Sequence, residues 1–369
     1  MGIVPTLSVI IPTYNEEANV ANLAKALAAV LTGIDYELIF VDDSTDTTPL
    51  LLAQLAQANA RLRYLHRNVR GLGRALVAGL MAAHGDILAI LDADFQHPPA
   101  LLLPMLTAIS DGADLVLPSR FLPGGSDGGL SRSRQLVSLG ARYLGKALLR
   151  PLRPISDPTG GLIMFRSSVI DGVQFRPLSW KIPAEILVRG HYQRVVEIPY
   201  RFSVRAAGTS KLNARESFNY LIHLLRLVLD SPRDRRFFLF ALVGTSGFLV
   251  DISLYSLALH LHAPVIASGF FSATCAMIWN FTWNDLVTWR ANHHARISVR
   301  ALKYAAVSSA GIAISTSTLA LAYQLLHFQP LPAKLLGIIL AITWNYLLNS
   351  HWTWREPSLA PILVTRVSV

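Results

Sequence analysis

Two aspartates and a glutamine directly follow one of the apolar runs of this 369-residue chain. They are Asp92, Asp94 and Gln96 of DADFQHPP, after the run Ile87–Leu91. Carboxylate and amide oxygens suit hard cations, and Mg²⁺ usually takes one or two carboxylates together with substrate phosphates. Such a cation stabilises a diphosphate leaving group. An isolated D-x-D is more often a solvated turn, but this one ends an apolar run beside other polar clusters, which favours a metal site.

Two other polar clusters follow apolar runs earlier in the chain. PTYNEE follows Leu7–Ile11, and DDSTDTT follows Tyr36–Val41. An aromatic ring in such a cluster can stack on a base, and a carboxylate can accept hydrogen bonds from a base or a ribose. Asn and Asp are also good helix N-caps, and both roles can coexist.

The elements that must position these clusters alternate along the chain. Short β-rich runs are separated by Ala- and Leu-rich segments with helical spacing at Val20–Leu31, Leu50–Asn59 and Leu76–Ala83. This alternation predicts a parallel α/β sheet with helices on both faces. Ligands bind such sheets at the carboxyl ends of the strands, which places the three clusters in one site. We also expect strands near Leu115–Leu117, Gly161–Phe165 and Arg194–Ile198, and a helix across Gln135–Leu149.

The composition indicates domains of different kinds. Hydrophobic residues make up 52% of the chain and charged residues only 15%, with a net charge of +10. The positive charge suits phosphorylated ligands at an anionic membrane surface. Nucleic acid ranks low as a partner because no helix-turn-helix, zinc or RNA-binding signature accompanies the charge. The single cysteine excludes an intrachain disulfide, and the absence of a secretory signal predicts a cytosolic N-terminal domain.

Four stretches in the last third are apolar enough to span a bilayer, which needs roughly 20 residues each. Basic residues flank these stretches, whereas the turns near His262 and Pro330 carry only Lys334. The positive-inside rule then predicts a cell-membrane protein whose catalytic domain and both termini are cytoplasmic. Residues 213–232, with apolar side chains at helical spacing, favour an interfacial helix over a packed helix of a soluble domain. The four stretches are about Phe237–Leu261, Ala263–Trp283, Leu302–Phe328 and Ala333–Trp352.

Two segments near the C-terminus share the pattern W-N-aromatic-x-x-N-x-x-x-T-W. They begin at Trp279 and Trp344. An aromatic belt at the membrane surface explains the tryptophans but not the shared Asn and Thr spacing, so the pattern favours a duplicated helical hairpin. Asp251 lies inside the first apolar stretch, where a functional role and a structural pairing are equally open.

Seven short motifs occur in order along residues 7–212: VIIPTYNEE, VDDSTD, RGLGRAL, DADFQHPP, PSRF, DPTGG and GTSKL. The set resembles family 2 glycosyltransferases of GT-A fold, and more narrowly the dolichol-phosphate mannose synthase group. The membrane part resembles the GtrA-like module that is fused to such enzymes. The resemblance implies an α/β GT-A domain over 1–212, an interfacial amphipathic helix over 213–232 and a four-helix transmembrane module over 233–369.

The resemblance also implies which residues bind a nucleotide-sugar donor. Pro12, Tyr14 and Glu16 match donor-binding positions, and Asp42 matches the acid that contacts the base. The basic pair that clamps the donor diphosphate corresponds to Arg205 and Lys211 of RAAGTSKL.

A metal site and an acceptor pocket follow from the same resemblance. Asp92, Asp94 and Gln96 match the ligands of Mg²⁺ or Mn²⁺, with Asp92 also among the donor-binding positions. Arg134 and Ser138 are four residues apart and would share one helix face, although Arg132 competes with Arg134 as the residue that contacts the acceptor phosphate. The acceptor-phosphate pocket would comprise Arg120, Arg134 and Ser138, and the catalytic residues Asp94, Arg120 and Arg134.

The implied reaction is the transfer of one hexose, most favourably from GDP-mannose, to polyprenyl or dolichyl phosphate with inversion. A phosphate monoester is largely ionised at neutral pH, so no protein base is required. The Q-x-x-R-W motif of processive relatives is absent. The alternatives are UDP-glucose as donor, another lipid or a protein as acceptor, or a non-enzymatic protein that translocates or binds lipid-linked sugar. The tight loop VDDSTDTT, Gly160-Gly161 and Pro183 depart from the family pattern and leave the donor open.

Overall fold

The computed structural model describes residues 6–128, 132–176, 181–203, 214–290, 292, 295–324, 328, 330–354 and 362–367. The chain divides into two compact units. The first comprises Met1–Ser231 together with Ala360–Val369, and the second comprises Pro232–Leu359.

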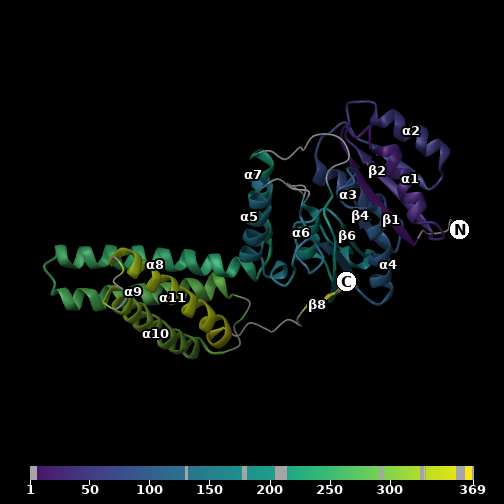
Figure 1. Cartoon of the computed structure of the whole chain (residues 1–369). Coiled ribbons are helices and arrows are strands. Elements are labelled where there is room, and N and C mark those ends of the chain that lie inside the picture. Colours follow the sequence, from purple (N-terminus) through teal and green to yellow (C-terminus); the bar gives the residue numbers. More distant parts are fainter. Residues whose placement is uncertain are drawn as a thin grey trace. The chain divides into compact units, whose positions relative to one another are not determined.

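An eight-stranded sheet forms the centre of the first unit, in the order β3-β2-β1-β4-β6-β5-β7-β8 (Figure 1). Apolar residues dominate the inner strands, as suits a pleated surface that is buried on both faces. The strands are β1 Leu7–Thr13, β2 Tyr36–Asp42, β3 Leu62–His66, β4 Ile87–Ile90, β5 Leu115–Ser119, β6 Ile163–Arg166, β7 Arg194–Pro199 and β8 Leu363–Arg366.

The prediction of a parallel sheet is wrong at one strand. Strand β6 runs antiparallel to both of its neighbours, β4 and β5, whereas the other pairs are parallel. The segment before β6 stays at the carboxyl edge of the sheet, because Asp157 pairs there with Arg120 at the end of β5. Strand β6 therefore starts from that edge and runs back.

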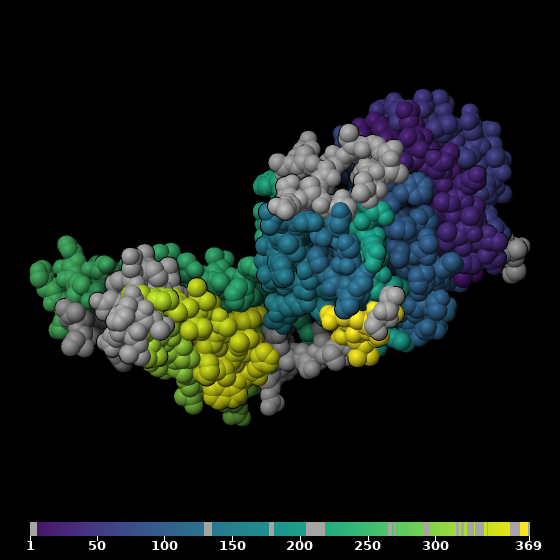
Figure 2. Space-filling model, in the orientation of Figure 1, coloured from purple at the N-terminus to yellow at the C-terminus, as the bar shows by residue number. Residues whose placement is uncertain are grey.

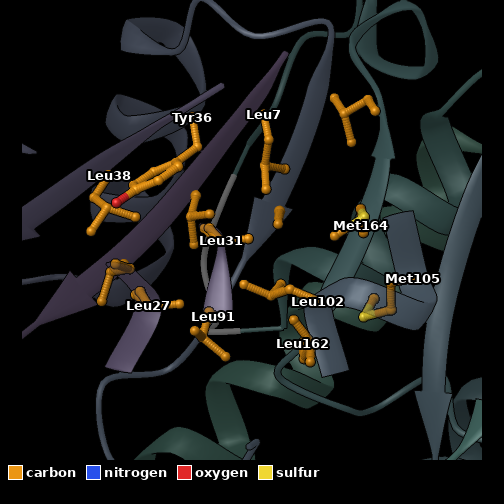
Figure 3. Packing of buried hydrophobic residues seen from close by; sticks show 14 of the residues in the cluster. Leu7, Leu27, Leu31, Tyr36, Leu38, Leu91, Leu102, Met105, Leu162 and Met164 are labelled. Carbon is orange, nitrogen blue, oxygen red and sulfur yellow. The ribbon is translucent and has the colours of Figure 1, made fainter. Parts of the chain in front are cut away.

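Helices cover both faces of this sheet, as predicted. Alternate residues of β1 point to opposite faces: Leu7 lies in one hydrophobic cluster with α1 and α4, and Ile10 lies in a second cluster with α3, α6 and α7. Figure 3 shows the first cluster, in which Leu27 of α1 and Met105 of α4 pack over the sheet. The helices are α1 Val20–Val30, α2 Thr48–Ala58, α3 Leu72–Ala82, α4 Leu102–Ser110, α5 Arg132–Leu148, α6 Ile182–Arg189 and α7 Ala214–Asp230.

The C-terminal strand corrects a predicted domain boundary. Residues 233–369 were expected to form the membrane module, but β8 pairs in parallel with β7 of the first unit, with Val364 opposite Val195. The strand covers what would otherwise be an open sheet edge. Residues 360–369 therefore belong with the α/β unit.

The second unit consists of long apolar helices. Helix α8 packs against α9, and α10 packs against α11 (Figure 1). Among the described residues, Asp234–His260 and Ile297–Ile314 are long and apolar enough to cross a membrane. The four-span arrangement stays a prediction. The helices are α8 Asp234–His260, α9 Val265–Trp283, α10 Ile297–Gln324 and α11 Pro330–Leu348, and the π-helical segments η4 Asn284–Thr288 and η5 Asn349–Thr353 follow α9 and α11.

The two W-N-aromatic motifs make matching contacts. In each, the Thr hydroxyl donates to the Asn four residues earlier, Thr288 to Asn284 at 2.8 Å and Thr353 to Asn349 at 2.7 Å. The final tryptophans of the motifs stack with ring centroids 4.3 Å apart; they are Trp289 and Trp354. These contacts support the proposed hairpin duplication.

Candidate active site

The DAD motif follows β4 at the carboxyl edge of the sheet, beside the ends of β1 and β2. Asp92 has a side chain 35% exposed and accessible to a ligand, whereas Asp94 is buried and its Oδ1 accepts the Gln96 N–H at 3.0 Å. Phe95, between Asp94 and Gln96, adopts the left-handed region at φ 61°, which turns the chain sharply. A Cβ on Gly161 would lie 2.2 Å from Asp92 Oδ2, so only glycine leaves room for this carboxylate.

The donor atoms at this strand end fit a hard divalent cation. Among the described residues, no three His, Cys, Asp or Glu side chains gather closely enough to hold a metal by themselves. Asp92 and Asp94 are two carboxylates, and Gln96 offers an amide oxygen in the same loop. Two carboxylates completed by substrate phosphates are a usual Mg²⁺ arrangement, so the donor set fits a metal that binds together with its substrate.

Asp42, the acid expected to contact the base, is fully buried at the end of β2. Its Oδ1 accepts hydrogen bonds from Thr13 at 2.8 Å and from Ser44 at 2.5 Å, and its Oδ2 lies 2.9 Å from His66 Nδ1. Pro12 lies inside β1, opposite Val41. The Asp42 carboxylate therefore contacts the end of β1, the end of β3 and the loop after β2 in this structure.

Tyr14 and Glu16 lie in the loop that follows β1. The guanidinium of Arg70 lies over the Tyr14 ring, 4.2 Å from its centroid. Glu16 is buried, and its Oε2 accepts a hydrogen bond from Asn19 at 2.7 Å. Sequence reasoning missed Arg70, although the RGLGRAL motif that it begins was a signal. A cation over an aromatic ring at this edge is suited to a donor base or phosphate.

The residues expected to bind the acceptor phosphate centre on Arg120 at the end of β5. Its Nε and Nη2 donate to the two Asp157 carboxylate oxygens at 2.7 and 3.1 Å, and Nη2 also reaches Ser138 Oγ of α5 at 3.3 Å. Burial lowers the pKa of Arg120, but the hydrogen bonds and charge of Asp157 outweigh burial and raise that pKa. Arg120 therefore stays a cation. Arg134 lies one helical turn before Ser138 in α5, and its side chain is outside the described residues.

Two buried titratable residues near the Arg120–Asp157 pair were not predicted from the sequence. Lys181 donates to the Thr159 carbonyl at 2.6 Å, and burial lowers its pKa to about 7. His97 lies 3.0 Å from the Tyr200 hydroxyl through Nε2, and burial lowers its pKa to about 3, so the ring is uncharged at neutral pH. His97 ends the DADFQH motif, which was the available signal, whereas only the fold brings Lys181 to the site.

One of the departures from the family's sequence pattern, Pro183, has a simple structural explanation. Pro183 lies in the first turn of α6. A proline there costs no hydrogen bond, because the first N–H groups of a helix have no intrahelical partner. The helix is thus not interrupted. Arg205 and Lys211 lie outside the described residues, as does the side chain of Arg132.

Two family models match the chain. Residues 8–173 match glycosyl transferase family 2, and residues 239–354 match the GtrA/DPMS transmembrane domain. Together with the mixed sheet and its strand-end aspartates, these matches define a membrane-bound glycosyltransferase of GT-A fold. The predictions of a GT-A fold, a glycosyltransferase and a GtrA-like module are thereby confirmed.

Individual relatives narrow the class. The chain is 34% identical over 352 residues to the dolichol-phosphate mannosyltransferase of Pyrococcus furiosus, and the alignment covers 94% of this chain and 99% of that protein. It is 33% identical over 234 residues to the dolichol-phosphate mannosyltransferase of Saccharomyces cerevisiae, and that alignment covers 60% of this chain and 86% of the yeast protein. The chain belongs to the dolichol-phosphate mannosyltransferase family.

The chain is also similar to proteins of known structure. Glucosyl-3-phosphoglycerate synthase from Mycobacterium tuberculosis, in complex with Mn²⁺, uridine diphosphate and glucosyl-3-phosphoglycerate, aligns with a TM-score of 0.46 at 24% identity. The alignment covers 60% of this chain and 80% of that one.

Proposed function

We propose that this glycosyltransferase moves one hexose, with GDP-mannose as the favoured donor, onto the phosphate of a polyprenyl or dolichyl lipid. The observation that carries the proposal is the similarity to the Pyrococcus furiosus dolichol-phosphate mannosyltransferase across 94% of the chain. The DAD carboxylates and the Arg120–Asp157 pair add chemical support, because they lie at the same edge of one sheet.

The donor half of the proposal depends on Asp92, Asp94 and Gln96. These residues would hold Mg²⁺ or Mn²⁺, and the cation when bound would neutralise the charge that builds on the departing nucleotide diphosphate. Tyr14 and Arg70 present an aromatic ring and a cation for the nucleotide. Arg205 and Lys211 remain our proposed clamp on the diphosphate.

The acceptor half depends on a fixed cation. Asp157 orients the Arg120 guanidinium, which with Ser138, and as proposed Arg134, would hold the lipid phosphate. Because that phosphate is already anionic near neutral pH, its oxygen can attack without a protein base. Near neutral pH the His97 ring is uncharged, so it would not compete as a cation with the metal ion for the carboxylate ligands. Positioning and charge stabilisation would supply most of the rate in a single in-line displacement with inversion.

The surfaces of α5 and α7 support a bilayer-facing site. Helix α7 buries one apolar face against the sheet, including Leu224 and Leu227, yet exposes a second apolar stripe. Tyr220 of α7 donates to the Ala141 carbonyl of α5, so the two helices lie together. Such exposed stripes favour helices that dip into the membrane surface. The exposed apolar side chains are Leu136, Val137, Tyr143 and Leu144 of α5 and Phe218, Leu221, Leu225 and Leu229 of α7.

The topology follows as part of the same proposal. We place the catalytic unit and both termini on the cytoplasmic side of the cell membrane. Pairing of β8 with β7 supports a C-terminus on the same side as the catalytic sheet. The positively charged loops of the helical unit support the same orientation.

Parallel transfer assays test this function. Membranes containing the full chain are incubated with labelled GDP-mannose or UDP-glucose, each with dolichyl or undecaprenyl phosphate, and label in the lipid extract is measured. We expect GDP-mannose to label the lipid; labelling by UDP-glucose instead would favour the glucosyl alternative. Label in neither lipid would contradict the proposal.

A matched pair of aspartates tests the metal site. Asp94→Ala should abolish transfer that a divalent cation restores after chelation, whereas Asp86→Ala should leave it unchanged. Asp86 is exposed just before β4, at the opposite end of the strand from the DAD motif. Full activity of Asp94→Ala in the presence of chelator would contradict the metal-dependent mechanism.

A further inference from the structure

A cleft of about 480 Å³ lies between α5 and the C-terminal strand of the first unit. Figure 2 shows the C-terminal segment, in yellow, against the blue and teal surface of this unit. Among the described residues that line the cleft, none is acidic and three are cationic. The lining residues that matter here are Phe121, Arg142, Lys146, Ser156, Arg366 and Val367.

The three cations of this cleft are close enough to disfavour one another. Burial, and then the charge of Arg142 and of Arg366, lower the pKa of Lys146, with Glu197 acting in the opposite direction. Lys146 Nζ donates to the Ile155 carbonyl at 2.8 Å. Convergence of like charges without an anion is unfavourable, so this arrangement favours a ligand of opposite sign.

The Glu197 carboxylate, whose charge acts on Lys146, already has hydrogen-bond partners. Glu197 is fully buried in β7, and its Oε1 accepts the Ser156 N–H at 2.7 Å and the Ser156 hydroxyl at 2.6 Å. Its Oε2 accepts from Arg366 Nε at 3.3 Å. Among the described residues, one carboxylate thus balances one of the three cations that line the cleft, and two cations are left without a carboxylate partner there.

Arg142 supplies an observation that does not depend on charge balance. Its Nε is buried and has no hydrogen-bond partner within the part of the chain that the structure describes. Buried donors in folded proteins nearly always have partners, and an unsatisfied one points to a missing ligand. The guanidinium stacks on the Phe121 ring at 4.1 Å, which holds it at the cleft.

We propose that this cleft is a second anion site, distinct from the acceptor-phosphate pocket, which binds the phosphate of a lipid headgroup or a free phosphate ion. The Phe121 ring also contacts the Arg120 guanidinium at 5.2 Å, so one aromatic side chain connects the two sites. Arg142 and Lys146 continue the four-residue spacing of Ser138 along α5. A phosphate in the cleft would therefore lie one to two turns from the proposed acceptor phosphate.

The C-terminal strand completes this site. Arg366 is the last residue of β8, and its Nη2 donates to the Pro154 carbonyl at 3.1 Å. Because β8 follows the helical unit in the sequence, the site forms only when the returning strand pairs with β7. Anion binding would in turn stabilise that pairing, by linkage.

Binding is tested on the full chain in neutral detergent. The probes are inorganic phosphate and phosphatidylglycerol, with phosphatidylcholine as the uncharged comparison, and the readout is the unfolding temperature as probe is added. We expect an anionic probe to raise it, and Lys146→Gln and Arg366→Gln each to weaken the apparent affinity about tenfold, the loss of one charged hydrogen bond. A response to phosphate alone identifies the free ion, and one to phosphatidylglycerol alone identifies the headgroup.

Two control variants keep the proposal falsifiable. Arg61→Gln removes the same charge at an exposed position of the same unit, over the Tyr36 ring, and should respond like the wild type. Lys146→Arg keeps the charge and should retain binding. Circular dichroism verifies that each variant is folded. No response of the wild type to either probe, or equal responses of Arg366→Gln and Arg61→Gln, would overturn the site. Neither result depends on sugar transfer, so failure here is separable from failure of the proposed function.

Discussion

Each unit of the molecule contains a buried arginine–aspartate pair with the same bidentate geometry. In the α/β unit, Arg120 donates to Asp157 at 2.7 and 3.1 Å. In the helical unit, Arg300 donates to Asp285 at 2.7 Å through both Nε and Nη2. The side chains of all four residues are less than a tenth exposed.

The surroundings of the two pairs differ. Trp354 Nε1 donates to Asp285 at 2.7 Å, and Arg300 also donates to the Ala295 carbonyl, so this pair is enclosed by its own module. Arg120 instead reaches Ser138 at a strand end where ligands bind in α/β sheets. Identical ion-pair chemistry thus serves structure in one unit and, as we propose, substrate in the other. Only the neighbours distinguish them.

Arg120→Lys should have the largest effect. Lysine keeps the charge but cannot make the planar two-bond contact with Asp157 that fixes its direction. We expect kcat to fall by about 10²–10³-fold, as on removal of an oriented charge-stabilising donor. The measurement is transfer to the lipid acceptor, with Arg61→Lys as control. An unchanged kcat would mean that both ion pairs are structural.

Asp285→Asn should lower stability and leave the chemistry intact. Breaking a buried pair by neutralising one partner costs about 3 kcal/mol or more, because it leaves Arg300 uncompensated. The unfolding temperature in detergent should fall, while kcat at low temperature is retained. Replacing both partners, as in Asp285→Leu with Arg300→Met, should cost less than the single change. A single variant that loses kcat without losing stability would give this pair a catalytic role.

Gly161→Ala should affect the active site alone. The added Cβ would lie 2.2 Å from Asp92 Oδ2, so the carboxylate must move. A misplacement of this size should reduce kcat by about 10-fold to 10²-fold. Gly140→Ala in α5, where nothing lies within 4 Å of the added Cβ, is the matched control and should keep full activity. Equal activities of the two variants would contradict the placement of Asp92.

The smallest effect concerns Lys181, whose pKa of about 7 lies below its ordinary 10.5 because of burial. Between those values the unfolded chain binds one more proton than the folded protein, so stability rises with pH across this window. The slope is at most about 1.4 kcal/mol per pH unit. It is measured as the change in unfolding temperature with pH, and Lys181→Met should flatten it. A wild-type unfolding temperature that falls across the window would contradict a buried, proton-releasing lysine.

Local pattern determined much of this protein. Apolar runs such as Leu7–Ile11 and polar clusters such as DADFQHPP identified the strands and their ends, because strand periodicity and turn formation depend on residues that are adjacent in the sequence. The seven ordered motifs identified the glycosyltransferase class, and long apolar stretches identified the membrane module. These features depend on residues close together in the chain.

Tertiary structure alone decided the rest. The reversed direction of β6, the return of β8 to the sheet and the positions of Lys181 and Arg366 depend on contacts between residues far apart in sequence. The apolar pattern of a strand does not indicate whether the strand runs parallel or antiparallel to its neighbours. An isolated lysine or arginine in a sequence is predicted to be a solvated surface charge. Burial and partners, which exist only after the chain has folded, turn such residues into an ion pair, a titratable group or an anion site.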